Sequence, residues 1–230
     1  MTLELQDATP KPAAPELQSG AVLCSSDLFG VIYCDPPWRY EWAMANKGVD
    51  VENHYPTMAT EEICAIKVPS AKNCVLYMWA TAPKLLDAIA VINAWGFQYK
   101  THAIWDKQRT GMGYWFMGQH ELLMVATRGK VSPPPSERRT SSLLSYPRGA
   151  HSSKPDKVRE LIAAWFPDAR KLEMFARPWT EMWPKLDGWE TWGNELPNDV
   201  AMTPNKEAQQ PSQSEASCGQ AWQHLRPVRF

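Results

Sequence analysis

A chain of 230 residues, 44% of them hydrophobic, is long enough to bury a substantial core in one domain of ordinary size. A net charge of −1 excludes a uniformly basic surface, so any contact with nucleic acid must come from a local patch. The five cysteines are odd in number and form no C-x-x-C pair, which excludes a disulfide framework and indicates reduced, intracellular thiols. No run is long or apolar enough to span a membrane, and the N-terminal segment lacks the apolar core of a signal peptide. We therefore expect a soluble, cytoplasmic protein.

The first apolar, β-branched run covers residues 29–34 and predicts a buried strand. The next four residues, Asp35-Pro36-Pro37-Trp38, must end it, because the prolines fix φ and supply no amide hydrogen. Residues 39–55 are polar, aromatic and irregular, which is typical of a lid or a substrate-binding loop. Thr60, followed by two acidic residues, indicates the start of a short helix that ends near Pro69.

The middle of the chain alternates strands with a helix. Residues 73–81 predict a second buried strand, and residues 97–105 and 120–127 predict two more. Pro83 opens a helix after the first of these, and Gly96 ends it. The apolar face of that helix is expected to consist of Leu85, Leu86, Ile89 and Ile92. The alternation predicts an α/β fold with a parallel-type sheet and helices on both faces.

The second half of the chain contains an irregular, basic segment. Residues 128–159 hold eight Lys or Arg residues against two acidic ones. A solvated loop is the simplest interpretation, but we favour a surface that follows nucleic-acid phosphates beside the Asp35 turn. From Pro155 onward an amphipathic helix is predicted, and residues 170–175 predict a further strand. The helix has apolar residues at i, i+3, i+4 and i+7, namely Val158, Leu161, Ile162 and Trp165.

The Asp35 turn has the groups needed to hold an exocyclic amine of a nucleobase. Such an amine is a weak nucleophile, because its lone pair is delocalised into the ring, so it must be held in line with a methyl donor. The Asp35 carboxylate and the Pro36 carbonyl can accept its two N–H groups, Pro37 stiffens the turn, and Trp38 offers a face for an extruded base. Positioning then supplies most of the rate, with no metal or covalent nucleophile. The alternative is a Pro-Pro loop with a capping Asp and a half-buried Trp, and the tetrapeptide alone leaves both interpretations open.

Seven further motifs follow the turn, and together with it they cover roughly residues 21–196. They are Tyr55-Pro56-Thr57-Met58, Leu76-Tyr77-Met78-Trp79, Gly113-Tyr114-Trp115, His120-Glu121, His151-Ser152-Ser153-Lys154-Pro155, Glu173-Met174-Phe175-Ala176-Arg177-Pro178 and Trp192-Gly193-Asn194-Glu195. In this order they resemble the MT-A70 family of adenine methyltransferases, in particular its bacterial and phage DNA branch. The resemblance implies a single Rossmann-like α/β methyltransferase domain with the permuted, β-type motif order. We expect this domain to span residues 21–196, between a disordered leader (1–20) and a largely disordered tail (197–230).

The resemblance also implies S-adenosylmethionine as cofactor and a set of residues that bind it. Lys154, just before a helix, would bind the cofactor's carboxylate, although a solvated lysine is the commoner case. Arg177 would contact the ribose or orient its neighbours, Asn194 and Glu195 would contact the ribose hydroxyls and the adenine amine, and Asp35 would border the methyl group. The chain has Trp179-Thr180 where some members have His-Asn, and Asn194-Glu195 where some have Asn-Gln, so ribose contacts through Trp179 and Thr180 stay open.

The residues expected to bind the target are mostly aromatic or basic, namely Trp38, Tyr55, Tyr114, Trp115, Arg138 and Arg139. Tyr114 and Trp115 belong to a loop with three glycines, where they would wedge into a duplex or stack on the displaced base; packing on the sheet is the alternative. His102, His120 and His151 lack metal-ligand spacing, so no metal is expected. His120 and Glu121 are interpreted as structural or target-loop residues.

The sequence therefore predicts an adenine-specific DNA methyltransferase that modifies the 6-amino group. RNA adenine methylation by the same chemistry is the first alternative. A non-catalytic nucleic-acid-binding subunit is another, although the intact turn argues against it. Methylation of a small molecule or a protein amine would leave the basic segment 128–159 unexplained. DNA is the expected partner, and a homodimer or a partner subunit stays open.

Overall fold

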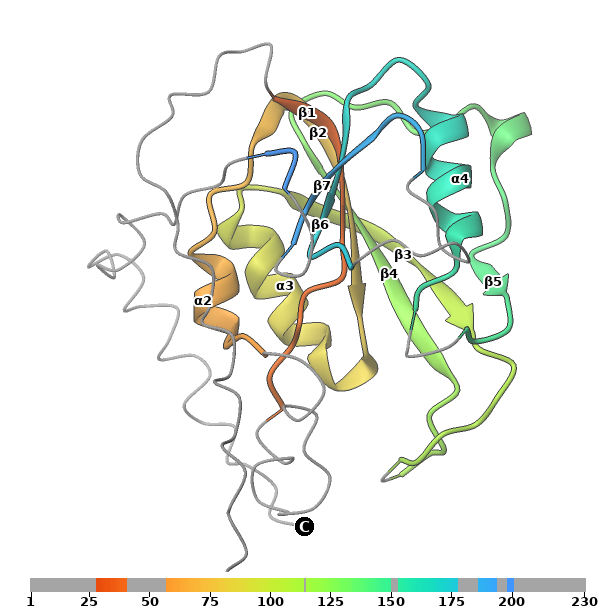
Figure 1. The fold of residues 1–230 in the computed structure, drawn as a ribbon. Coiled ribbons are helices and arrows are strands. Elements are labelled where there is room, and N and C mark those ends of the chain that lie inside the picture. The colour runs from red at the N-terminus through yellow and green to blue at the C-terminus, as the bar shows by residue number, and fades with distance from the viewer. Residues whose placement is uncertain are drawn as a thin grey trace, which may run out of the picture.

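The computed structural model describes residues 28–40, 57–113, 115–149, 153–177, 186–193 and 198–200, which form one seven-stranded sheet with helices against both faces (Figure 1). The strands are β1 (Phe29–Cys34), β2 (Ser70–Ala80), β3 (Gln98–Asp106), β4 (His120–Arg128), β5 (Leu143–Ser145), β6 (Lys171–Met174) and β7 (Trp189–Trp192). The helices are α2 (Thr60–Cys64), α3 (Leu85–Ala94) and α4 (Asp156–Trp165), with 3₁₀ turns η3 (Ala82–Lys84) and η4 (Ser136–Arg138). The expected leader and nearly all of the expected tail lie outside the described residues.

The sheet is mixed, and the expectation of a parallel-type sheet is wrong for one strand. The strand order is β5-β3-β4-β2-β1-β6-β7. β1 pairs in parallel with β2 and β6, and β6 pairs in parallel with β7. β4 runs antiparallel to both of its neighbours, β2 and β3. The reason is the connection from β3 to β4, because a loop without a helix can return the chain only in the opposite direction.

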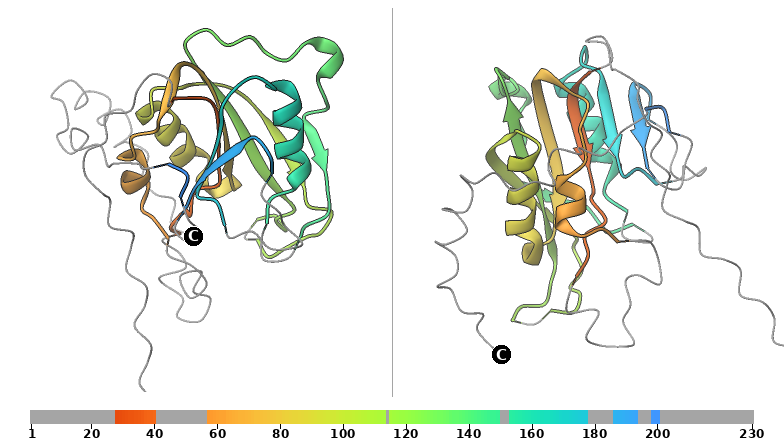
Figure 2. Two further views of the ribbon diagram at one scale, coloured as in Figure 1. Left: turned by 45° about the horizontal axis from the view of Figure 1, so that its top comes forward. Right: turned by 90° about the vertical axis from the view of Figure 1, so that its left-hand side faces the viewer.

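The two faces of the sheet carry separate cores, which confirms the prediction of helices on both faces. Figures 1 and 2 show α3 and α4 on opposite sides of the strands. Ile32 of β1 belongs to the cluster on the α3 side, with Val91 and Ile92. Val31 belongs to the cluster on the α4 side, with Ile162. Since β1 is buried on both faces, its sequence reads as a continuous apolar run.

The predicted apolar face of α3 is confirmed for Ile89 and Ile92, which pack in the core, and is wrong for Leu86. Leu86 is 74% exposed, whereas the helix buries Ala88, Val91 and Ile92. At 3.6 residues per turn, Leu86 lies on the opposite side of the helix from these three residues. The buried positions still follow the i, i+3, i+4 spacing, but from a different starting residue. Gly96 ends the helix as predicted, with a φ of +76°.

Several strand ends meet at one edge of the sheet. Cys34, the last residue of β1, pairs with Met78 of β2 and with Met174 of β6. The antiparallel β4 contributes its beginning to this edge, because Ala80 at the end of β2 pairs with Leu122. Ligands of open α/β sheets bind at this edge, beyond the carboxyl ends of the parallel strands. None of the helices within the described residues has the length and hydropathy needed to cross a membrane.

Candidate active site

The Asp35 turn is held by backbone hydrogen bonds and by a buried indole. The Trp38 amide donates to the Pro36 carbonyl at 2.8 Å, and the Met58 amide donates to the Pro37 carbonyl at 2.8 Å. The Trp38 indole is only 5% exposed and donates to the Trp79 carbonyl at 3.2 Å. This burial favours an anchoring role for Trp38 over the stacking role expected from the sequence. The Pro36 carbonyl keeps a second lone pair for another donor.

Asp35 belongs to a chain of ion pairs that begins at Lys107, just after β3, and passes through Glu121 of β4 and Lys154. Lys154 Nζ lies 2.7 Å from Asp35 Oδ2 and 3.2 Å from Glu121 Oε2. Glu121 in turn accepts from Lys107 Nζ at 3.3 Å. Lys154 also lies 5.9 Å from the centre of the Trp79 ring. The structure therefore brings together Asp35 and Lys154, which the sequence singled out, and adds Glu121.

The protonation equilibria of this cluster reflect its burial. Burial raises the pKa of Asp35, and the Glu121 charge raises it further, while the Lys154 charge opposes both. For Lys154, burial alone would lower the pKa, but the Asp35 and Glu121 carboxylates outweigh it and the net pKa is raised. Lys154 consequently stays charged at neutral pH. Asp35 is a carboxylate whose ionised form depends on its lysine partner.

The end of β6 forms the second half of the site. Phe175 has a φ of +60°, a left-handed conformation that is costly for a bulky residue and is often found at functional sites. The following Ala176 amide donates to the Trp192 carbonyl at 3.0 Å. A Cβ on Gly193 would lie 2.2 Å from the Ala176 carbonyl oxygen, so this position requires glycine. The two strand ends therefore pack too closely for a side chain between them.

A buried ion pair ties α4 to β6 behind this corner. Arg159 donates to Glu173 at 2.5 Å and also binds Asp156. Burial raises the pKa of Glu173, and Arg159 opposes that rise. The pair fixes the start of α4, which Lys154 precedes, relative to the strand that leads to Arg177. The Arg177 charge is close enough to lower the pKa of Asp35, so both halves of the site act on the same carboxylate.

The residues present fit the amino-acid end of S-adenosylmethionine. Ser153, adjacent to Lys154, has a buried hydroxyl without a hydrogen-bond partner among the described residues. Lys154 offers a cation for a carboxylate, and the Ser153 hydroxyl offers a hydrogen-bonding group beside it. A buried polar atom without a partner indicates a place where a ligand group is expected. Asn194 and Glu195, which were expected to bind the cofactor's ribose and adenine, lie outside the described residues, as do Trp179 and Thr180.

The residues expected to bind the target are placed in different regions. Trp115 is 75% exposed, on the loop between β3 and β4. Tyr55 and Tyr114 lie outside the described residues. Arg138 and Arg139 lie on and beside η4, where the Arg138 carbonyl accepts from the indole of Trp165, the last residue of α4.

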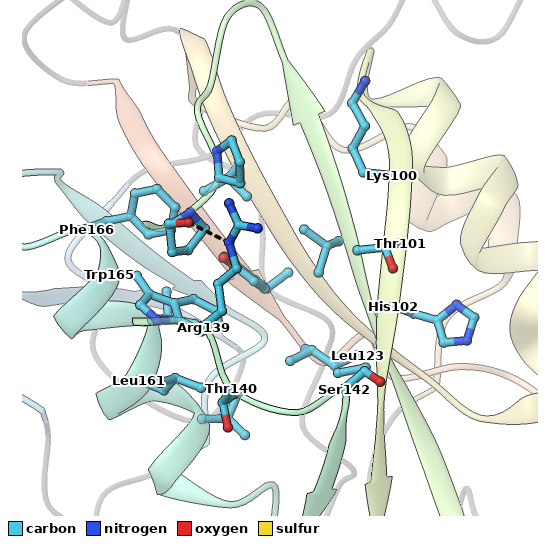
Figure 3. Close-up of a pocket in the computed structure, with 18 of the residues that line it drawn as sticks. Lys100, Thr101, His102, Leu123, Arg139, Thr140, Ser142, Leu161, Trp165 and Phe166 are labelled. Carbon is cyan, nitrogen blue, oxygen red and sulfur yellow. Dashed lines mark hydrogen bonds between the residues drawn. The ribbon is translucent and has the colours of Figure 1, made fainter. Parts of the chain in front are cut away.

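A cavity of about 540 Å³ lies beside Arg139, between α4, β3 and β4 (Figure 3). Its walls include Tyr77, Leu123 and Trp165, and none of Asp35, Trp38 or Lys154. Arg139 bends back over it and donates to the Pro134 carbonyl at 2.8 Å. Because Trp165 ends the helix that Lys154 precedes, this arginine pair and the Asp35 turn are separated by roughly 15 Å of helix. The structure does not bring Arg138 and Arg139 to the turn.

Sequence reasoning missed Glu121 and Ser153 as parts of this site. Glu121 was assigned to the structure or to the target loop, because its contact with Lys154 depends on the reversed direction of β4. The pairing of Trp105 with Glu121 in the hairpin would have placed Glu121 at the functional edge. Ser153 gives no signal of its own, since only its burial reveals that the hydroxyl is unpartnered.

Comparisons with known proteins identify the family of this chain. The MT-A70 family model matches residues 29–195, from the start of β1 past the end of β7. The Type II methyltransferase M.MunI of a Mycoplasma species is 34% identical over 197 residues, which cover 77% of this chain and 82% of that protein. The N(6)-adenosine-methyltransferase MT-A70-like protein of Arabidopsis thaliana is 29% identical over 177 residues, 73% of this chain and 24% of that protein.

The human N(6)-adenosine-methyltransferase catalytic subunit METTL3 is 26% identical, over 73% of this chain and 28% of that protein. This chain thus spans most of M.MunI and about a quarter of the plant and human relatives. The resemblance seen in the sequence motifs is confirmed: the chain belongs to the MT-A70 family of S-adenosylmethionine-dependent methyltransferases.

Proposed function

We propose that this protein methylates the 6-amino group of adenine in DNA, in the cytoplasm. The observation that carries the proposal is the Asp35 carboxylate, which is fixed by prolines at the functional edge of the sheet and paired with Lys154 at 2.7 Å. M.MunI, the relative matched over 82% of its length, is a Type II methyltransferase, and we assign this chain to the same substrate class, DNA. The relatives named as N(6)-adenosine methyltransferases support adenine as the base.

In this mechanism the turn holds the amine by its two hydrogens. One N–H donates to Asp35 and the other donates to the free lone pair of the Pro36 carbonyl. These acceptors orient the nitrogen lone pair away from the ring, so that it becomes available as a nucleophile. Bound S-adenosylmethionine would supply the electrophilic methyl group, whose bond to sulfur would break as the bond to nitrogen forms. The extra proton on nitrogen leaves to solvent.

Lys154 has two roles in the proposed mechanism. It balances the charge of Asp35, and it presents a cation to the cofactor's carboxylate beside the Ser153 hydroxyl. Lys154 is also paired with Glu121, so it keeps this ion pair when the Asp35 carboxylate accepts a hydrogen bond from the amine. Arg177, Asn194 and Glu195 would complete the cofactor pocket. Tyr55, Tyr114, Trp115, Arg138 and Arg139 remain the proposed contacts with the target strand, and the two arginines would act at a distance from the turn. Trp38 anchors the turn through its buried indole.

The test is transfer of tritiated methyl from S-adenosylmethionine to unmethylated duplex DNA and, separately, to structured RNA. Wild type, Asp35→Ala and the control Asp168→Ala should be compared, because Asp168 is an exposed carboxylate remote from the turn. We expect label on DNA adenine with the wild type and the control, and none with Asp35→Ala. Label on RNA alone would show that the substrate is RNA and not DNA, and would leave the proposed methylation of adenine unchanged. Cofactor binding without transfer to either polymer would contradict the proposed substrate.

A further inference from the structure

The loop between β3 and β4, residues 107–119, presents a cluster of apolar side chains to solvent. Four of its residues are large, hydrophobic and exposed: Met112 by 93%, Phe116 by 87%, Trp115 by 75% and Met117 by 57%. Elsewhere in the described residues, only Leu85, Leu86 and Leu143 are exposed large hydrophobics. Isolated apolar residues on a surface need no explanation, but a contiguous group marks a binding surface.

Hydrogen bonds brace the loop as an extension of the β3–β4 hairpin. The Lys107 amide donates to the Gln119 carbonyl at 2.9 Å, and the Gly111 amide donates to the Gly118 carbonyl at 2.7 Å. Near the tip, a Cβ on Gly113 would lie 1.9 Å from the Phe116 carbonyl oxygen. Gly113 and Phe116 therefore approach too closely for any residue but glycine at position 113, and the exposed Met112 and Phe116 lie on either side of this glycine in the sequence.

The loop rises from the edge of the sheet that carries Asp35. The strand before the loop, β3, ends at Asp106, which pairs with His120 at the start of β4. Figures 1 and 2 show the connection projecting beyond the sheet, at the end where β1 runs into the Asp35 turn. At its base, Lys107 binds Glu121, which binds Lys154, which binds Asp35. The base of the loop is thus connected to Asp35 through three ion pairs.

From these observations we infer that Met112 and Phe116 form a wedge that enters duplex DNA and fills the space left by the extruded adenine. This inference rests on the proposed function and deepens it. The 6-amino group of a paired adenine is engaged with its partner base, so the base must leave the stack before Asp35 can hold it. Apolar side chains inserted between base steps lower the cost of that unstacking.

Length and charge favour DNA as the occupant of this surface. Arms of five residues reach at most roughly 17 Å from the sheet, further than the roughly 8 Å depth of a DNA groove. Arg109 is exposed on the arm that leads to Met112, where it would meet a phosphate. Apolar residues at the tip and a cation on the arm match a duplex, with its stacked interior and anionic outside.

The test uses the full chain and short duplexes that contain a methylation site mapped first in unmethylated genomic DNA. In one duplex the target adenine is paired with thymine, and in a second it lies opposite an abasic position and needs no unpairing. The variants are Met112→Ala, Phe116→Ala and the double variant. Leu86→Ala is the matched control, because it removes an exposed apolar side chain from α3.

We expect the double variant to lose about ten- to a hundredfold in kcat/KM on the paired duplex, since unstacking costs a few kcal/mol. On the abasic duplex it should recover to within about threefold of wild type. Equal losses on both duplexes, or no loss on the paired one while the wild type remains active, would overturn the wedge and leave the proposed function intact. A wild type without activity on any DNA would refute the proposed function itself. The remaining alternative is that the tip contacts a second copy of the chain. Light scattering tests it, because a double variant with a lower molar mass than wild type would assign the tip to that contact and overturn the wedge.

Discussion

Two ion pairs in this molecule have the same separation and opposite surroundings. Lys154 and Asp35 lie 2.7 Å apart with side chains 12% and 27% exposed. Arg170 and Glu190 also lie 2.7 Å apart, but their side chains are 40% and 34% exposed. The exposed pair joins the beginnings of β6 and β7 and contributes little, because water screens it. The buried pair shifts the pKa of both partners and sits where the parallel strands end. Burial and position, not distance, distinguish the pair that we propose to be functional from the pair that is not.

The largest expected effect comes from removing the cation of the buried pair. Lys154→Met leaves two carboxylates, Asp35 and Glu121, without their shared partner, and we expect a loss of about 3 kcal/mol in the free energy of unfolding. Urea denaturation at neutral pH measures it. Lys157→Met is the matched control, because Lys157 lies three residues further on, in α4, and is paired with Glu160 on the exposed side of that helix. A similar small loss for both variants would contradict the comparison.

Replacing the carboxylate by its amide should separate activity from stability. Asp35→Asn keeps the shape but loses the charged acceptor, and we expect methyl transfer to fall by about a hundredfold. Because the folded state raises the pKa of Asp35, folded wild type holds this proton more tightly than the unfolded chain does. The contribution of Asp35 to stability is therefore present at low pH and lost as pH rises through the raised pKa. Unfolding in urea at acidic and neutral pH should show the variant gaining on wild type as pH rises.

A smaller effect is expected on the pH profile. The ionised form of Asp35 accepts the amine, so kcat/KM should fall on acidification through a pKa above the ordinary carboxyl range. Glu121→Gln removes a charge that raises this pKa, so the acid limb should move to lower pH. Rates measured across the acid range test the shift. An acid limb that stays in place would show that Glu121 does not act on Asp35 through charge.

The smallest effect concerns the exposed pair. Glu190→Gln should change the free energy of unfolding by about 0.5 kcal/mol or less and leave methyl transfer unchanged. Thermal unfolding at low and high salt checks both parts of this expectation, because screening should abolish even the small difference. A loss as large as that of Lys154→Met would show that exposure does not distinguish the two pairs.

The sequence was informative where local chemistry dictates structure. The apolar run before Asp35, the prolines after it and the Gly96 helix end were all predictable, because each follows from one short stretch. β5 and β7 were not predicted, since strands of three and four residues carry too little pattern and owe their conformation to their neighbours. The position of Arg138 and Arg139 was not predictable either. A count of charges does not tell that they lie near the last residue of α4 and not near its beginning, where Lys154 is. Glu121 required the direction of β4, which only the assembled sheet reveals.

The reversed direction of β4 has a consequence for engineering this protein. Both ends of the 107–119 loop leave the sheet at the same edge, and the hydrogen bond from the Lys107 amide to the Gln119 carbonyl closes it at the base. Segments of different length and sequence can therefore be grafted between these two residues without changing the register of β3 and β4. Since loop closure grows only slowly in cost with length, such grafts should leave Glu121 and Lys154 in place. The proposed catalytic edge and the neighbouring hairpin could thus be engineered separately, the first for the chemistry and the second for the surface presented to a substrate.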